Sequence, residues 1–61
     1  MKIKLTINVS VEKKHGMTEG RIFDVFREQE QDRKQSGGWW VIGDAGEEIK
    51  ILGHEAEVVQ T

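Results

Sequence analysis

The sequence predicts a single, small, all-β domain, and three observations lead to this prediction. The chain has 61 residues, which is enough for one domain and no more. Its first stretch alternates apolar with polar residues, the pattern of a strand with one buried face. Further along, short aromatic and β-branched runs lie between glycine-containing turns. We therefore expect one domain over residues 1–61, built from several short strands around one core.

The first strand is expected over residues 3–11. Its apolar residues occupy the odd positions: Ile3, Leu5, Ile7, Val9 and Val11. Most of them are β-branched, which favours a strand over a helix. Because a strand of this length offers an open edge, a homodimer, if one forms, is expected to pair two copies along residues 3–11.

The second strand is harder to place, because the apolar residues near Phe26 suit either a strand or one face of a helix. No apolar residue lies between Phe26 and Trp39, so the later turns of a helix would have nothing to bury. We expect a strand at 21–27, followed by a mobile, charged connection at 28–37. A helix over residues 19–34 is the alternative.

Glycines and charged residues mark the predicted loops and turns, which lie at 12–20, 37–38, 44–46 and 53–55. In the tight turn at 44–46, Gly46 is free to take a positive φ. The turn at 53–55 is expected to form one turn of 3-10 helix. The remaining strands are expected at 39–42, 47–52 and 56–59.

Four or five short strands cannot form a sandwich of two full sheets. Curling one sheet into a small barrel, closed or partly open, hides the edges of the sheet and its single apolar face. We therefore expect a small five-stranded barrel with a short 3-10 turn before its last strand.

Four stretches of the sequence resemble small SH3-like proteins of phages and prophages: His15–Gly20, Phe23–Val25, Trp40–Glu47 and His54–Val59. The resemblance covers residues 15–59 and implies an SH3-like barrel. It further implies a phage-type accessory protein that binds and modulates or inhibits a host protein in the bacterial cytoplasm. The resemblance does not extend to SH3 domains that bind proline-rich peptides. Those need several aromatic rings in one groove, and this chain has no tyrosine.

The composition favours an intracellular, soluble protein without a membrane partner. The chain has no cysteine, which rules out disulfides and thiolate metal sites and fits a reducing cytoplasm. It has no apolar run of about 20 residues that could span a bilayer. Its alternating start also lacks the continuous apolar core of a signal peptide.

No pattern of residues indicates an enzyme. The serine and threonine hydroxyls have no base at a recognisable spacing, and the glycine pairs lack the strand-to-helix context of a phosphate loop. The two histidines have no spacing that demands a metal. We therefore expect a binding protein that needs no catalytic residue, no cofactor and no metal.

The residues expected to contact a protein partner are Trp39, Trp40, Phe26, Arg33 and Lys34. Neighbours in a strand point to opposite faces, so the two tryptophans cannot both enter the core. An exposed aromatic side chain is the usual anchor of a protein interface. Arg33 and Lys34 lie in the polar connection before the tryptophans.

A nucleic-acid-binding barrel of the SH3 or KOW-like kind is the alternative function. Its contacts would be Lys13, Lys14 and Arg21 on the first long loop, with Arg33 and Lys34 on the second. Acidic residues are interleaved with the second group, and the net charge of the chain is -2. Both observations weaken a track for phosphates.

Overall fold

A computed structural model describes residues 1–60, and Thr61, the last residue of the predicted domain, lies outside the described residues. The elements in chain order are β1 (Lys2–Leu5), the 3-10 helix η1 (Lys13–His15), β2 (Ile22–Asp24), β3 (Arg27–Gln29), β4 (Gly38–Ile42), β5 (Glu48–Leu52) and β6 (Ala56–Gln60). The prediction of an all-β fold is therefore confirmed. The alternative of a helix over residues 19–34 is wrong, because two strands occupy that stretch.

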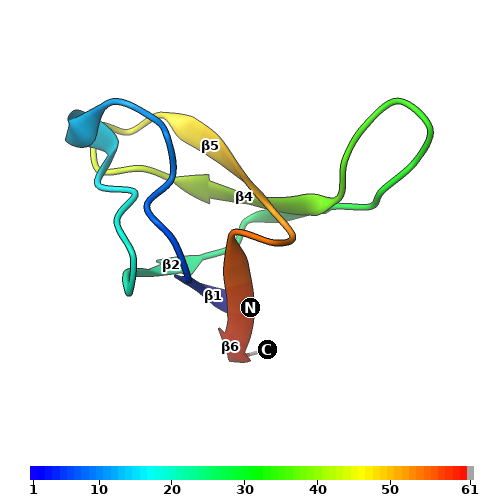
Figure 1. The fold of residues 1–61 in the computed structure, drawn as a ribbon, viewed down its shortest axis with the longest axis horizontal. Coiled ribbons are helices and arrows are strands. Elements are labelled where there is room, and N and C mark those ends of the chain that lie inside the picture. Colours follow the sequence, from blue (N-terminus) through cyan, green and yellow to red (C-terminus); the bar gives the residue numbers. More distant parts are fainter. Residues whose placement is uncertain (61) are drawn as a thin grey trace.

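The strands form two three-stranded antiparallel sheets, with the orders β2-β1-β6 and β3-β4-β5 (Figure 1). Only Val25 and Phe26 separate β2 from β3, so the chain passes directly from one sheet into the other. Among residues 1–60, strand pairing does not close into a ring. The finding is thus a β fold of two small sheets.

The core lies between the two sheets. Its buried apolar residues are Ile3, Leu5, Met17, Phe23, Val41, Ile51 and Ala56. Most of them occupy inward positions of β1, β2, β4, β5 and β6, as strand alternation requires. Ile3, for example, lies opposite Phe23 on one side and Val58 on the other. Burying one such aliphatic side chain contributes about 1.5–3 kcal/mol.

The strand predicted over residues 3–11 ends much earlier, at Leu5. Its partner β6 begins opposite Leu5 and its partner β2 begins opposite the preceding residue. Beyond that point no strand edge is available. The backbone N–H of Thr6 instead donates to the carbonyl of Glu55, and that of Val9 to the carbonyl of Met17, both at 2.9 Å. The alternating pattern therefore continues into a loop.

The predicted open edge at residues 3–11 is also wrong. β1 is the central strand of its sheet and pairs with β2 on one side and β6 on the other. Its backbone groups are already used, so a homodimer cannot form by pairing two copies of this strand.

The prediction of a 3-10 turn at residues 53–55, before the last strand, is wrong. At residues 53–55 the chain makes an ordinary turn, closed by one bond from the N–H of Glu55 to the carbonyl of Leu52 (3.0 Å). A 3-10 helix needs consecutive bonds of this kind. They occur in η1, where His15 donates to Glu12 and Gly16 donates to Lys13, each at 3.1 Å.

The later strands lie close to their predicted positions. β4, β5 and β6 fall within a residue of the ranges 39–42, 47–52 and 56–59. The turn at 44–46 is confirmed, with Gly46 at φ 84°. The strand predicted at 21–27 is instead divided between β2 and β3, so the charged connection begins only after Gln29.

Candidate interaction groove

Three half-exposed apolar side chains converge on one groove between β2 and the end of β4. Ile22, Phe26 and Ile42 are 53%, 49% and 50% exposed. Ile22 begins β2, Phe26 lies in the bend before β3, and Ile42 ends β4. Together with Phe23, Asp24 and Val25, they line a groove of about 390 Å³. This groove is the candidate functional site.

Trp40 lies beside the groove, on the same outward face of β4 as Ile42. Arg27 is its cross-strand neighbour, and the guanidinium carbon lies 4.8 Å from the centroid of the Trp40 ring. The same guanidinium lies 5.9 Å from the Phe26 ring. These are cation–π distances. The indole Nε1 is enclosed and has no hydrogen-bond partner among the described residues. Arg27 therefore connects Trp40 to Phe26.

Trp39 has a different role from its neighbour. It lies opposite Ile51 and packs, partly buried, against the hydrophobic core. The structure therefore separates the two tryptophans onto opposite faces of β4, as expected. Of the two, only Trp40 belongs to the surface that carries the groove.

The structure does not bring Arg33 and Lys34 to the groove. Both are exposed in the loop at 30–37, which stands away from the two sheets (Figure 1). This loop enters β4 at Gly38, the end of the strand opposite Ile42. Its tip is shaped by Asp32, whose Oδ1 accepts hydrogen bonds from the backbone N–H groups of Lys34 (2.7 Å) and Gln35 (2.8 Å). These two bonds lower the pKa of the Asp32 carboxyl.

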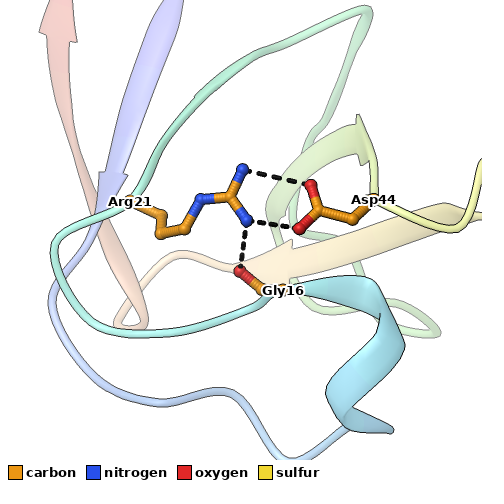
Figure 2. Close-up of polar contacts among 3 residues, drawn as sticks. All are labelled: Gly16, Arg21 and Asp44. Atoms are coloured by element: carbon orange, nitrogen blue, oxygen red, sulfur yellow. Dashed lines mark hydrogen bonds and ion pairs between the residues drawn. The ribbon is translucent and has the colours of Figure 1, made fainter.

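Arg21, expected to contact nucleic acid, is engaged within the chain (Figure 2). Its guanidinium donates to both carboxylate oxygens of Asp44, at 2.6 and 3.1 Å, and to the carbonyl of Gly16 at 3.1 Å. Hydrogen bonding to Arg21 lowers the pKa of Asp44 and raises that of Arg21. This clamp, formed by Arg21, Asp44 and Gly16, ties the first long loop to the turn between β4 and β5.

The remaining basic residues of the nucleic-acid prediction do not join one surface. Lys13 and Lys14 lie on η1, and the Lys14 ammonium pairs with Glu12 at 3.4 Å. η1 and the loop at 30–37 lie at opposite ends of the molecule (Figure 1), whose longest extent is 31 Å. The two basic clusters are therefore separate.

The sequence prediction missed Ile22 and Ile42. Each has an apolar neighbour in its strand, Phe23 and Val41, and that neighbour is buried. A strand can turn only one of two adjacent residues toward the core. An adjacent apolar pair in a short strand is therefore the signal that could have identified both groove residues.

Within residues 1–60, no three His, Cys, Asp or Glu side chains are grouped so that they could hold a metal ion. No helix in that range combines the length and the apolar character needed to cross a membrane.

Comparison with known proteins gives no match: no family model, no curated protein and no solved structure is significantly similar to the chain. The functional interpretation therefore depends on the geometry of the chain itself, and in particular on the groove.

Proposed function

We propose that the protein is a small, non-catalytic binding protein that docks a partner protein on the groove of Ile22, Phe26 and Ile42. The observation that carries this proposal is the exposure of three large apolar side chains in one hollow. Contiguous exposed apolar surface on a small domain commonly marks a protein-interaction site. An aromatic ring among aliphatic residues, as Phe26 is here, is a typical anchor.

We extend the proposal to a phage-type SH3-like barrel that modulates or inhibits a host protein in the bacterial cytoplasm. Support for the barrel comes from strand order. If β2 and β3 are taken as one strand bent at Val25 and Phe26, the strands follow one another as β6-β1-β2/β3-β4-β5. Five antiparallel strands in this order, shared between two sheets, are what the resemblance implies.

The carboxylate that lines the groove is not suited to act as a general base. The carboxyls with a lowered pKa are Asp24, Asp32 and Asp44, and a local hydrogen bond accounts for each shift. Asp24, the one that lines the groove, is paired with the ammonium of Lys2 at 2.8 Å. A general base needs a pKa closer to neutrality, so a lowered pKa does not suit that role.

Nucleic-acid binding has less support as a proposed function. Arg21 is occupied by Asp44, and the two lysines of η1 are separated from the loop at 30–37. A phosphate track needs several free cations along one path.

Capture from bacterial lysate, measured by quantitative mass spectrometry, tests the docking proposal. The variant Ile22→Ser/Phe26→Ser/Ile42→Ser should retain about a tenth or less of the captured partner, because an apolar anchor has been removed. The control Ile7→Ser/Val11→Ser changes residues that are 41% and 38% exposed but lie outside the groove, and should capture normally.

Far-UV circular dichroism of both variants tests whether they remain folded. Equal capture by the groove variant and the wild type would show that the groove is not the docking site. An electrophoretic shift of DNA or RNA at low salt that disappears as salt rises would favour the nucleic-acid alternative.

A further inference from the structure

The backbone of β2 has one paired side and one free side. The N–H of Leu5 donates to the carbonyl of Arg21, and the N–H of Val25 donates to the carbonyl of Met1, both at 2.9 Å. Arg21 and Val25 therefore direct their backbone groups toward the N-terminal segment that contains β1. Because successive residues of a strand direct these groups to opposite sides, Ile22 and Asp24 direct theirs away from β1.

The end of β4 has a free side as well. The N–H of Phe26 donates to the carbonyl of Trp40 at 3.0 Å, so the backbone N–H and carbonyl of Trp40 point toward the β2/β3 side of the strand. The N–H of Gly43 donates to the carbonyl of Glu47 at 2.8 Å, so the backbone groups of Gly43 point toward β5. Ile42, two residues after Trp40, therefore directs its N–H and carbonyl toward β2. Pairing between β3 and β4 stops at Arg27 and Trp40, one pair short of Ile42.

The groove is thus bordered by two unpaired strand segments. Within residues 1–60, β2 and β4 are not paired with each other, so the backbone groups that Ile22, Asp24 and Ile42 direct to this side belong to no strand pairing. The side chains of Ile22 and Ile42 border the same hollow. Free donors and acceptors beside an apolar surface are what an added strand uses, the backbone for affinity and the side chains for selection.

We propose that the groove binds its partner as an added strand: an extended segment with apolar residues at alternate positions, flanked by acidic residues. This inference rests on the proposed docking function and specifies the chemistry of the partner. The acidic flanks follow from the charges beside the groove. Lys4 lies opposite Ile22, and Arg27 follows Phe26. Neither cation forms an ion pair with another described residue, whereas Asp24 is already neutralised by Lys2.

Two other free edges, those of β6 and β5, suit an added strand less well. β6 carries a bulge at Val59, because Lys2 lies opposite Gln60 while the next residue, Ile3, lies opposite Val58. A bulge disrupts the regular spacing that a new strand needs. The outer edge of β5 has Lys50 at its middle, and a lysine on an edge opposes pairing.

Hydrogen exchange followed by NMR tests the free edges without any partner. The amides of Ile22, Asp24 and Ile42 should exchange rapidly in the free chain, while those of Phe23 and Val41 should be protected. Slow exchange at all three groove amides before any ligand is added would show that they are already bonded, and would overturn the inference.

Fluorescence anisotropy tests binding with a panel of labelled seven-residue peptides. Each peptide has Val, Ile or Phe at alternate positions, Ser between them and Glu at both ends. At least one should bind and protect the three groove amides. N-methylation of all the backbone amides of a binding peptide should weaken binding about tenfold, because the added strand can then donate no hydrogen bond to the free carbonyls that border the groove. Replacing the terminal Glu by Lys should also weaken binding.

The outcomes separate this inference from the docking proposal. If the Ile22/Phe26/Ile42 variant loses lysate capture but no peptide of the panel binds, or N-methylation of all the peptide amides leaves binding unchanged, the added strand is refuted and docking stands. If peptides bind as expected but the groove variant captures its partner normally, the proposed function fails. Binding of the chain's own residues 6–12 as a peptide, in preference to the panel, would overturn the partner assignment in favour of a second copy.

Discussion

At the scale of single residues, the clamp of Arg21, Asp44 and Gly16 is the most specific polar contact in the molecule. It joins the loop after β1 to the turn between β4 and β5 through a two-pronged guanidinium–carboxylate contact. Both side chains stay partly exposed, at 40% and 49%, so the clamp orders two loops at the surface. A lysine in place of Arg21 would keep the positive charge but lose the bidentate hydrogen bonding to the Asp44 carboxylate.

The clamp predicts how stability depends on pH. The pKa of Asp44 is lowered below its ordinary value of 3.8 because the carboxylate accepts hydrogen bonds from Arg21. A lowered pKa contributes stability above the unfolded-state pKa, and this contribution is lost as pH falls through the folded-state pKa. Asp44→Asn should therefore lower Tm at pH 7, and the difference from wild type should shrink below about pH 4.

Thermal unfolding of both proteins between neutral and strongly acidic pH checks this prediction. Asp24 and Asp32 also have lowered pKa values and titrate in the same window in both proteins. For that reason the difference between variant and wild type is the quantity to follow. A difference that stays constant across the whole range would contradict the assigned role of Asp44.

Gly38 supports a second prediction at this scale. A Cβ at Gly38 would collide with the backbone carbonyl of Ile51 on the neighbouring strand β5. Gly38→Ala should therefore destabilise the protein by about 1–3 kcal/mol in urea unfolding. Gly53→Ala is the matched control, since nothing lies within 4 Å of a Cβ there. Equal unfolding midpoints for the two variants would show that β4 and β5 can separate to accept the methyl group.

At the scale of elements, the accuracy of sequence prediction follows from how local each signal is. The hairpin of β4 and β5 is specified by residues close together in the sequence, including Gly46 in its turn. Each boundary of its two strands was predicted to within one residue. The end of β1 was not, because it depends on where two distant strands begin to pair. The alternation of Ile7 and Val11 continues although no partner strand is present.

At the candidate site too, features set by local sequence were predicted and features set by distant strands were not. Phe26 was predicted to contact a partner, and its side chain is half-exposed, while alternation correctly placed the two tryptophans on opposite faces. Alternation could not say which tryptophan faces inward, since that depends on the register of β4 against β5. Nor could it place Ile22 beside Ile42. That arrangement arises only because the chain bends between β2 and β3 and leaves β2 and the end of β4 unpaired.

The loop at 30–37 supports a prediction at the element scale. Asp32 holds its tip through hydrogen bonds to the amides of Lys34 and Gln35. Asp32→Ala should accelerate hydrogen exchange of these two amides about tenfold while leaving Tm nearly unchanged, because residues 30–36 contribute nothing to the core. Asp32→Asn keeps an accepting oxygen and should behave like the wild type. A large fall in Tm for Asp32→Ala would show that the loop supports the sheets.

At the scale of the whole molecule, small size limits stability. At about 0.05–0.15 kcal/mol per residue, a chain of this length has about 3–9 kcal/mol in total. Ile51 is fully buried, so Ile51→Ala should cost about 2–5 kcal/mol. That is enough to populate the unfolded state noticeably at 25 °C. Ile22→Ala, at a position that is 53% exposed, should cost less than about 1 kcal/mol.

Urea unfolding of the two alanine variants tests this contrast. A small effect at Ile51 would mean that the core collapses around the missing atoms. A large effect at Ile22 would mean that this side chain supports the fold, which would weaken its assignment to a docking surface.

The pairing of β1 with β6 has a practical consequence for engineering. Lys2 lies opposite Gln60, so the two ends of the described chain emerge side by side (Figure 1). A short linker could join them, and new ends could be opened in the exposed loop at 30–37, where chain breaks are well tolerated. Because its two ends are adjacent, the domain could also be inserted into a surface loop of another protein without forcing apart the two ends of that loop.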